Sequence, residues 1–197
     1  MKMDVVAGSQ NDEHYTPPYA VAPILEFVRP GAKVWCPFDT DDSHFAKMLK
    51  AHGCIVTATH LDGGSDFFLT APPSGCDYIV SNPPYTKKVE VFERLFSLRV
   101  PFAMLVGVVG LFESQRRFHM FAQNQFEILY LNKRVAFFKD FAEQKPSVNP
   151  PFSSVYITQK MLPDRIVFRE IGKTSKPQPQ SSWNDMWQKP FVRQDLL

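Results

Sequence analysis

The sequence feature that most constrains the fold is the segment of residues 101–109, an almost unbroken apolar run (PFAMLVGVV). Such a run is typical of a strand buried within a parallel sheet. Other short apolar runs occupy residues 33–38, 54–59, 77–81 and 126–131. Segments with helical spacing separate the runs, and this alternation predicts a doubly wound α/β sheet. Residues 153–159 and 165–170 are expected to close the sheet as a final antiparallel pair.

The starts of three helices can be read from the sequence. The triplet Thr16-Pro17-Pro18 offers a threonine N-cap followed by prolines that suit a first helical turn. The triplet Asp41-Asp42-Ser43 is expected to cap a second helix in the same way. A third helix is expected over residues 114–124, with Phe118 and Phe121 facing inward.

A chain of 197 residues with 44% hydrophobic and 21% charged residues is expected to form one globular domain with a sizeable core. We place that domain at residues 15–172, after a loose polar segment at residues 1–14. Residues 173–197 are polar and rich in proline, but they also contain two tryptophans and a phenylalanine. This tail is either a flexible extension or a segment that docks its aromatic side chains on the domain.

The cysteines and histidines exclude several classes of protein. The three cysteines, Cys36, Cys54 and Cys76, are scattered without metal-ligand spacing, and the five histidines form no cluster. We therefore expect no metal site and no disulfide framework, and we expect the protein to reside in a reducing cytoplasm. The N-terminus lacks an apolar signal core, and no run is long enough to cross a membrane, so no membrane partner is expected.

The segment Ser81-Asn82-Pro83-Pro84-Tyr85 carries the most information about function. It follows the apolar run Asp77-Tyr78-Ile79-Val80, which reads as a buried strand, so the motif occupies the loop at the carboxyl end of that strand. Ligands of open α/β sheets bind at this edge. The two prolines fix φ and remove backbone donors, so the loop presents carbonyls, an amide side chain and an aromatic ring. These groups suit a planar amine that needs hydrogen-bond acceptors and a stacking partner. The alternative is a plain proline-rich turn.

This motif resembles the catalytic loop of class I S-adenosylmethionine (SAM)-dependent amino-methyltransferases, especially small phage-type DNA adenine-N6 methyltransferases. The resemblance implies the Rossmann-like fold of that class, with a seven-stranded, mostly parallel sheet. It also implies SAM as cofactor and a bacterial or phage-infected cytosol as location. The pattern extends over about residues 12–170, although only the Asn-Pro-Pro-Tyr loop is highly specific.

The resemblance also implies a mechanism. Asn82 and the Pro83 carbonyl would each accept a hydrogen from the N6 amine of adenine, with Pro84 holding the loop rigid. The nitrogen lone pair could then attack the SAM methyl group without a covalent enzyme intermediate. Tyr85 would stack on the adenine, which must leave the duplex to reach the pocket.

Cofactor-binding residues are implied by three further matches to the family, the third of which is Asp66-Phe67. Tyr15 and Thr16 match the N-terminal motif, in which a helix start meets the SAM carboxylate. Pro37, Phe38 and Asp39 match the motif after the first strand. The complete predicted cofactor site consists of Tyr15, Thr16, Pro37, Phe38, Asp39, His60, Asp66, Phe67 and Asn82. For Asp66 the alternative is an ordinary turn residue.

The chain departs from the family at two cofactor positions. The first-strand motif has Cys36 in place of the usual acid before the proline, and Thr40-Asp41-Asp42-Ser43 in place of a glycine-rich turn. Glycines allow the backbone to approach SAM closely, so their absence raises the question of cofactor affinity. Asp39 is a candidate for the displaced carboxylate. His60 stands where an acid normally holds the ribose hydroxyls.

The target side is expected to combine an aromatic cover with basic residues. Phe138 is the candidate to cover the open face of the flipped base, and a core role is its alternative. Candidates for nucleic-acid contacts are the basic pairs Lys87-Lys88, Arg116-Arg117 and Lys133-Arg134. A net charge of +2 permits a nucleic-acid partner but does not by itself imply one.

Several substrates are compatible with the motif. DNA is the expected partner, and adenine in RNA and a glutamine side chain in a protein are the alternatives within enzymes. A degenerate fold that binds nucleic acid or a partner without turnover is a further alternative. No separate target-recognition domain is visible, so sequence specificity is either weak or dependent on a homodimer; residues 112–125 and 139–152 are the only candidate recognition stretches.

Overall fold

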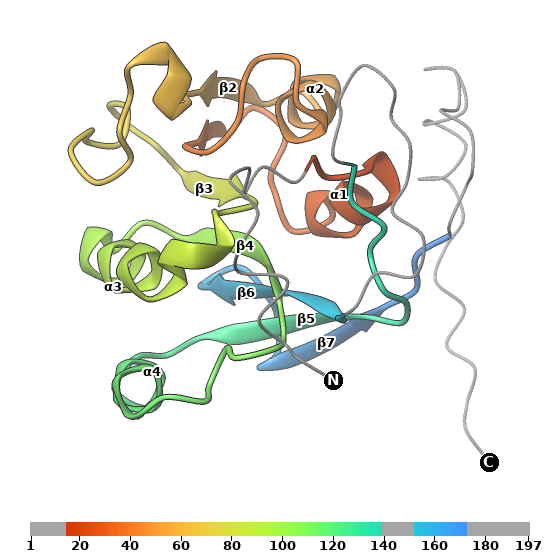
Figure 1. The fold of residues 1–197 in the computed structure, drawn as a ribbon. Coiled ribbons are helices and arrows are strands. Elements are labelled where there is room, and N and C mark those ends of the chain that lie inside the picture. The colour runs from red at the N-terminus through yellow and green to blue at the C-terminus, as the bar shows by residue number, and fades with distance from the viewer. Residues whose placement is uncertain (1–14, 139–151, 173–197) are drawn as a thin grey trace.

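The structure is a computed structural model that describes residues 15–138 and 152–172 (Figure 1). Predictions about the N-terminal segment, most of the stretch 139–152 and the aromatic tail therefore lie outside the described residues. The helices are α1 (Pro18–Leu25), α2 (His44–Ala51), α3 (Lys88–Leu98) and α4 (Gln115–Ala122). The strands are β1 (Lys33–Cys36), β2 (Ile55–Ala58), β3 (Tyr78–Ser81), β4 (Phe102–Gly107), β5 (Glu127–Leu131), β6 (Ser154–Gln159) and β7 (Ile166–Arg169). None of these helices is long and apolar enough to cross a membrane.

The strands form one seven-stranded sheet in the order β2-β1-β3-β4-β6-β5-β7. β1 pairs in parallel with both β2 and β3, and β3 pairs in parallel with β4. β6 is antiparallel to both of its neighbours, β4 and β5. β7 pairs in parallel with β5 and forms the edge. The expected α/β sheet, seven-stranded and mostly parallel, is confirmed.

The final pairing differs from the prediction. β6 and β7 were expected to pair with each other, but β5 lies between them in the sheet. All six residues of β6 pair with β4, and its side chains are almost all buried. A strand with two apolar faces gains more from an interior position than from an edge, whereas β7, with Ile166 and Phe168 exposed, is suited to the edge.

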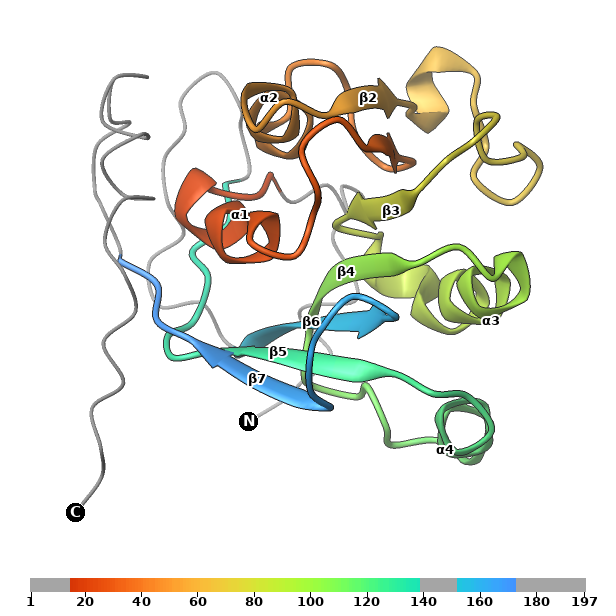
Figure 2. The ribbon, with the colours of Figure 1, turned by 180° about the vertical axis from the view of Figure 1, so that it is seen from behind.

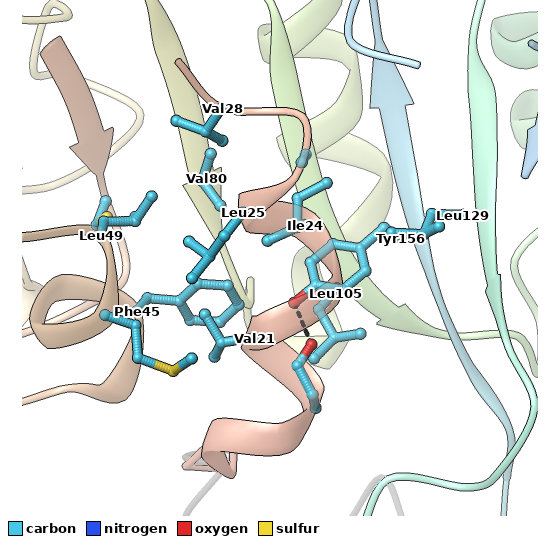
Figure 3. Packing of buried hydrophobic residues seen from close by; sticks show 14 of the residues in the cluster. Val21, Ile24, Leu25, Val28, Phe45, Leu49, Val80, Leu105, Leu129 and Tyr156 are labelled. Atoms are coloured by element: carbon cyan, nitrogen blue, oxygen red, sulfur yellow. Dashed lines mark hydrogen bonds between the residues drawn. The ribbon is translucent and has the colours of Figure 1, made fainter. Parts of the chain in front are cut away.

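Helices cover both faces of the sheet, with α1 and α2 on one side and α3 and α4 on the other (Figures 1 and 2). The first layer includes Ile24 from α1 and Phe45 from α2, which pack on alternate strand residues such as Val80 and Leu105 (Figure 3). Tyr156 of β6 is fully buried in this layer, and its hydroxyl donates to the Ala20 carbonyl at 2.6 Å. The bond anchors α1 to the centre of the sheet.

The predicted helix starts are confirmed in α2 and α4, where Ser43 and Ser114 are the N-caps, but not in α1. Ser43 is the N-cap of α2, and its hydroxyl accepts from the Ala46 N–H at 3.1 Å. The N-cap of α1 is Pro17 rather than Thr16, because the helix begins at the second proline. In α4, Phe121 is buried as predicted, but Phe118 is 62% exposed, so the inward orientation predicted for it is wrong. The helix is only eight residues long and packs on the sheet through one narrow face.

Candidate active site at the switch point of the sheet

The candidate site lies where the strand order reverses. From β1 the chain runs through α2 to β2 on one side, and it then returns to β3 on the other side of β1. The loops that leave the carboxyl ends of β1 and β3 therefore diverge to opposite faces of the sheet. In open α/β sheets, ligands bind in the crevice at such a switch point. The segment Pro37–Ser43 leaves β1, and Asn82–Tyr85 leaves β3. The two motifs with the strongest functional signal in the sequence thus meet at one edge.

The Asn-Pro-Pro-Tyr loop is short and firmly placed. Ser81 is the last paired residue of β3, opposite Met104 of β4. Pro83 is buried, and Pro84 is extended with φ −60° and ψ 137°, which the proline ring favours. The 3-10 helix η3 (Tyr85–Lys87) follows at once and leads into α3. The side-chain oxygen of Asn82 is buried against this loop.

Asp39 lies at the centre of the contacts that join the three strand ends. Its N–H donates to the Thr59 carbonyl beyond β2 at 3.1 Å, and Thr59 N–H donates to the Cys36 carbonyl of β1 at 3.0 Å. The Oδ2 atom of Asp39 accepts a hydrogen bond from the hydroxyl of Ser81. Trp35 adds a further link, because its Nε1–H donates to Thr59 Oγ1 at 2.9 Å. The ends of β1, β2 and β3 are thereby held in a fixed arrangement.

Burial makes the Asp39 carboxyl unusually basic. Only 8% of the residue is exposed, and loss of hydration raises its pKa from 3.8 to about 6. Hydrogen bonds from Ser81 and Ser43 and the nearby His60 oppose that effect and lower the pKa. The site therefore presents a buried carboxylate at neutral pH that can balance a positively charged ligand.

The turn after β1 does not require the glycines that the family pattern contains. Among the described residues, positive φ angles occur at five glycines and at Arg99 and Lys160, and none of these lies within residues 37–43. The side chains of Asp41 and Asp42 are exposed and turn towards α2. There they pair with Lys50 at 2.7 Å and with Lys47 at 3.0 Å, respectively. The turn thus adopts its backbone conformation without glycine.

The N-terminal residues of the predicted cofactor site lie beside α2. Tyr15 and Phe138 form a two-residue bridge, with N–H···O distances of 3.0 and 2.9 Å. Thr16 is buried, and its carbonyl accepts from the His44 ring at 2.9 Å. Burial lowers the pKa of His44, so the ring is neutral near pH 7 and donates through Nδ1. The start of α1 is thereby anchored against the start of α2.

The residues expected near the cofactor's nucleoside lie after β2. The His60 ring and the Asp62 carboxylate are 3.3 Å apart. Asp66 Oδ1 accepts from the Phe68 N–H at 2.8 Å, which is the turn role considered as its alternative. Phe67 is 3% exposed and packs on the half-buried ring of Phe38, with ring centroids 4.8 Å apart. Phe67 is therefore a core residue that supports Phe38.

Aromatic rings surround Tyr85 on the target side of the loop. Phe137 lies 6.3 Å and Phe152 lies 5.4 Å from Tyr85, centroid to centroid, both roughly perpendicular to it. The ammonium group of Lys88 lies 4.9 Å from the centre of the Tyr85 ring. Phe138, the residue predicted to cover the base, is instead buried with its ring 6.2 Å from that of His44. Alternation along the backbone directs Phe137 and Phe138 to different neighbours.

Gly107, at the end of β4, is required for this aromatic arrangement. A Cβ atom at this position would lie 2.8 Å from the ring of Phe152. The Gly107 carbonyl also accepts from Lys88 Nζ at 3.4 Å. The sequence analysis did not single out Gly107, and a glycine within an otherwise apolar strand was the available signal.

The three basic pairs have different surroundings. Lys87 follows Tyr85 and is exposed, with its ammonium 5.5 Å from the centre of the Phe68 ring. Arg116 pairs with Glu93 at 2.6 Å and Glu90 at 3.3 Å on α3, and Arg117 donates to the Gly110 carbonyl. Lys133 and Arg134 are exposed beyond β5. Of these residues, Lys87 and Lys88 lie directly at the candidate site.

Comparison with known proteins gives similarities to solved structures alone. No family model and no curated protein matches the sequence. A matching solved structure is the protein-(glutamine-N5) methyltransferase (release factor-specific) from Alicyclobacillus acidocaldarius subsp. acidocaldarius, with 18% sequence identity and a TM-score of 0.42. The match covers 73% of this chain and 93% of that chain.

Within the described residues, no group of three or more His, Cys, Asp or Glu residues could hold a metal ion.

Proposed function

We propose that this protein is a SAM-dependent methyltransferase that acts on the exocyclic N6 of adenine in DNA. The observation that carries the proposal is the position of Asn82-Pro83-Pro84-Tyr85 at the carboxyl end of β3, beside the switch point of the sheet. If a loop of this composition lay elsewhere on the surface, it would indicate only a proline-rich turn.

The residues at the end of β1 fit SAM as cofactor. Bound SAM would supply an electrophilic methyl group on a positively charged sulfur. The buried carboxylate of Asp39 complements that positive charge, and the half-buried ring of Phe38 offers an apolar surface. The turn at residues 37–43 has no positive φ angle, so its conformation is compatible with the missing glycines.

Methyl transfer requires the adenine amine to become a nucleophile. Asn82 Oδ1 and the Pro83 carbonyl would accept the two N6 hydrogens and favour a tetrahedral nitrogen. The nitrogen lone pair would be directed at the methyl carbon, and the carbon–sulfur bond would break with its electron pair left on sulfur. The nitrogen then releases one proton to water. Alignment and electrostatics account for the catalysis, and no acid–base residue is needed.

The surroundings of Tyr85 favour a nucleic-acid base as substrate over a flexible amide. Tyr85 and Phe152 are half-buried and supply aromatic surface for a flat ring, and the buried Phe137 packs against Tyr85. Lys87 and Lys88 supply positive charge for phosphates. An unpaired base in RNA would meet the same groups. DNA remains the proposed substrate because the motif most resembles that of DNA enzymes.

The test is transfer of labelled methyl from SAM to unmethylated DNA, RNA and protein extract in parallel. We expect label in DNA, recovered as N6-methyladenine. Asn82→Ala should reduce transfer by about 100-fold or more, the usual effect of removing a preorganised polar group. Its SAM affinity, measured by calorimetry, should stay near the wild-type value.

Asn124→Ala provides the matched control. Asn124 lies at the end of α4, where its side chain donates to the Met120 carbonyl at 2.8 Å. Its removal costs one hydrogen bond away from the site, so transfer should be unchanged. Label in RNA or protein alone would refute DNA as substrate, and neither label nor SAM binding would refute the enzyme assignment.

A further inference from the structure

Ser81 places a hydroxyl where a buried strand would ordinarily have an apolar side chain. It is 0% exposed, and the two residues before it, Ile79 and Val80, are equally buried core residues. Its hydroxyl donates to Oδ2 of Asp39, which lies 42 positions away along the chain. The next residue is Asn82, so the bond lies at the point where the chain leaves the sheet to form the catalytic loop.

The carboxyl group that Ser81 contacts is surrounded by groups from four other elements. Ser43, at the start of α2, donates a second hydrogen bond to it, and His60, beyond β2, interacts with it electrostatically. Cys36 of β1 and Tyr156 of β6 also lie near it; burial raises the pKa of both, and the negative charge of Asp39 adds to that effect. Neither of these last two groups ionises near neutral pH.

We propose that Ser81 is a positioning residue for the methyl transfer. By bonding to Asp39, it joins the cofactor side of the crevice to the loop that activates the amine, and it sets the direction in which Asn82 leaves β3. This inference rests on the proposed function and deepens it. A residue that acts in this way affects the alignment of the reacting atoms more than the binding of either substrate.

A purely structural role predicts a different result. Thr158 of β6 supplies the matched comparison, because it is also 0% exposed and donates its hydroxyl to a carboxylate, Glu127 Oε2, at 2.8 Å. Glu127 begins β5, at the opposite end of the strands from the catalytic loop. Thr158→Val therefore removes the same kind of bond without affecting the site.

The experiment measures kcat, the two KM values and unfolding for wild type, Ser81→Ala and Thr158→Val between pH 5 and 8.5. Ser81→Ala should lower kcat at pH 8 roughly tenfold, because the reacting groups are less well aligned. Its KM values for SAM and DNA should stay within about threefold of those of the wild type. Because ionised Asp39 complements the charge of SAM, kcat of the wild type should fall as the pH drops through about 6, and this fall is the acid limb of the profile. In Ser81→Ala the limb should move to higher pH, because a hydrogen bond that lowers the pKa of Asp39 is lost. Thr158→Val should lose stability but keep both kcat and the limb.

Two further variants keep the inference testable if Ser81→Ala does not fold. Asp39→Asn retains an oxygen that can accept from Ser81 but cannot ionise, so the acid limb should disappear. His60→Gln removes the other nearby titratable group and should keep the limb, moved to higher pH because His60 also lowers the pKa of Asp39. An unchanged kcat and limb in Ser81→Ala, or a limb that persists in Asp39→Asn, would overturn the positioning role. Absence of transfer by the wild type would overturn the proposed function and this inference together.

Discussion

Replacing Asp39 with asparagine should stabilise the folded protein at neutral and alkaline pH. Burial disfavours the ionised carboxylate, so the folded state holds the Asp39 proton more tightly than the unfolded chain does. This group therefore favours folding most below its unfolded pKa of 3.8, and that contribution is lost as the pH rises through about 6. Asparagine is neutral at every pH and can still accept the hydrogen bond from Ser81.

The size of the effect follows from the two pKa values. The pKa of Asp39 rises from 3.8 in the unfolded chain to about 6 in the folded protein, a difference of about 2. Each pKa unit corresponds to about 1.4 kcal/mol, so ionised Asp39 lowers the free energy of unfolding by about 3 kcal/mol. We expect Asp39→Asn to be more stable than wild type by roughly 2–3 kcal/mol at pH 8 and by less than about 1 kcal/mol at pH 4.

Urea unfolding at the two pH values measures this difference directly. Asp42→Asn is the matched control, because that carboxylate is exposed and pairs only with Lys47 at the surface. Its stability difference should stay small at both pH values. If Asp39→Asn were no more stable than wild type at pH 8, or if its advantage were equal at pH 4, the burial argument for Asp39 would be wrong.

Three further predictions concern the target side of the site. Tyr85→Ala should lower kcat/KM on duplex DNA by roughly 5- to 150-fold, the range that one base-stacking contact supplies, and should do so less on unpaired substrate; equal losses would argue against stacking on a flipped base. Gly107→Ala should displace Phe152, since its Cβ would lie 2.8 Å from that ring, and should lower both thermal stability and transfer. Lys87→Met should weaken DNA binding and reduce the slope of log K against log salt concentration by about 1. Arg116→Met should leave that slope nearly unchanged, because two glutamates already balance the charge of Arg116. If Arg116→Met changed the slope more than Lys87→Met, the DNA would bind near α4 and not near Lys87.

The candidate site was only partly predictable from the sequence. The Asn-Pro-Pro-Tyr loop could be recognised because prolines after an apolar run impose a local geometry that needs no distant partner. The orientation of Phe137 and Phe138 could not be read in this way. Both are phenylalanines in one short segment, and which of them faces Tyr85 depends on the bridge between Tyr15 and Phe138.

Local sequence signals predicted the class of fold and the position of the Asn-Pro-Pro-Tyr loop, because periodicity, proline and capping residues act within a few positions of each other. The tertiary structure decided the order of the last three strands, since β6 gains more burial between β4 and β5 than beside β7. It also decided the contact between Ser81 and Asp39. These two residues are separated by 42 positions, and only the parallel pairing of β1 with β3 brings the ends of their strands together.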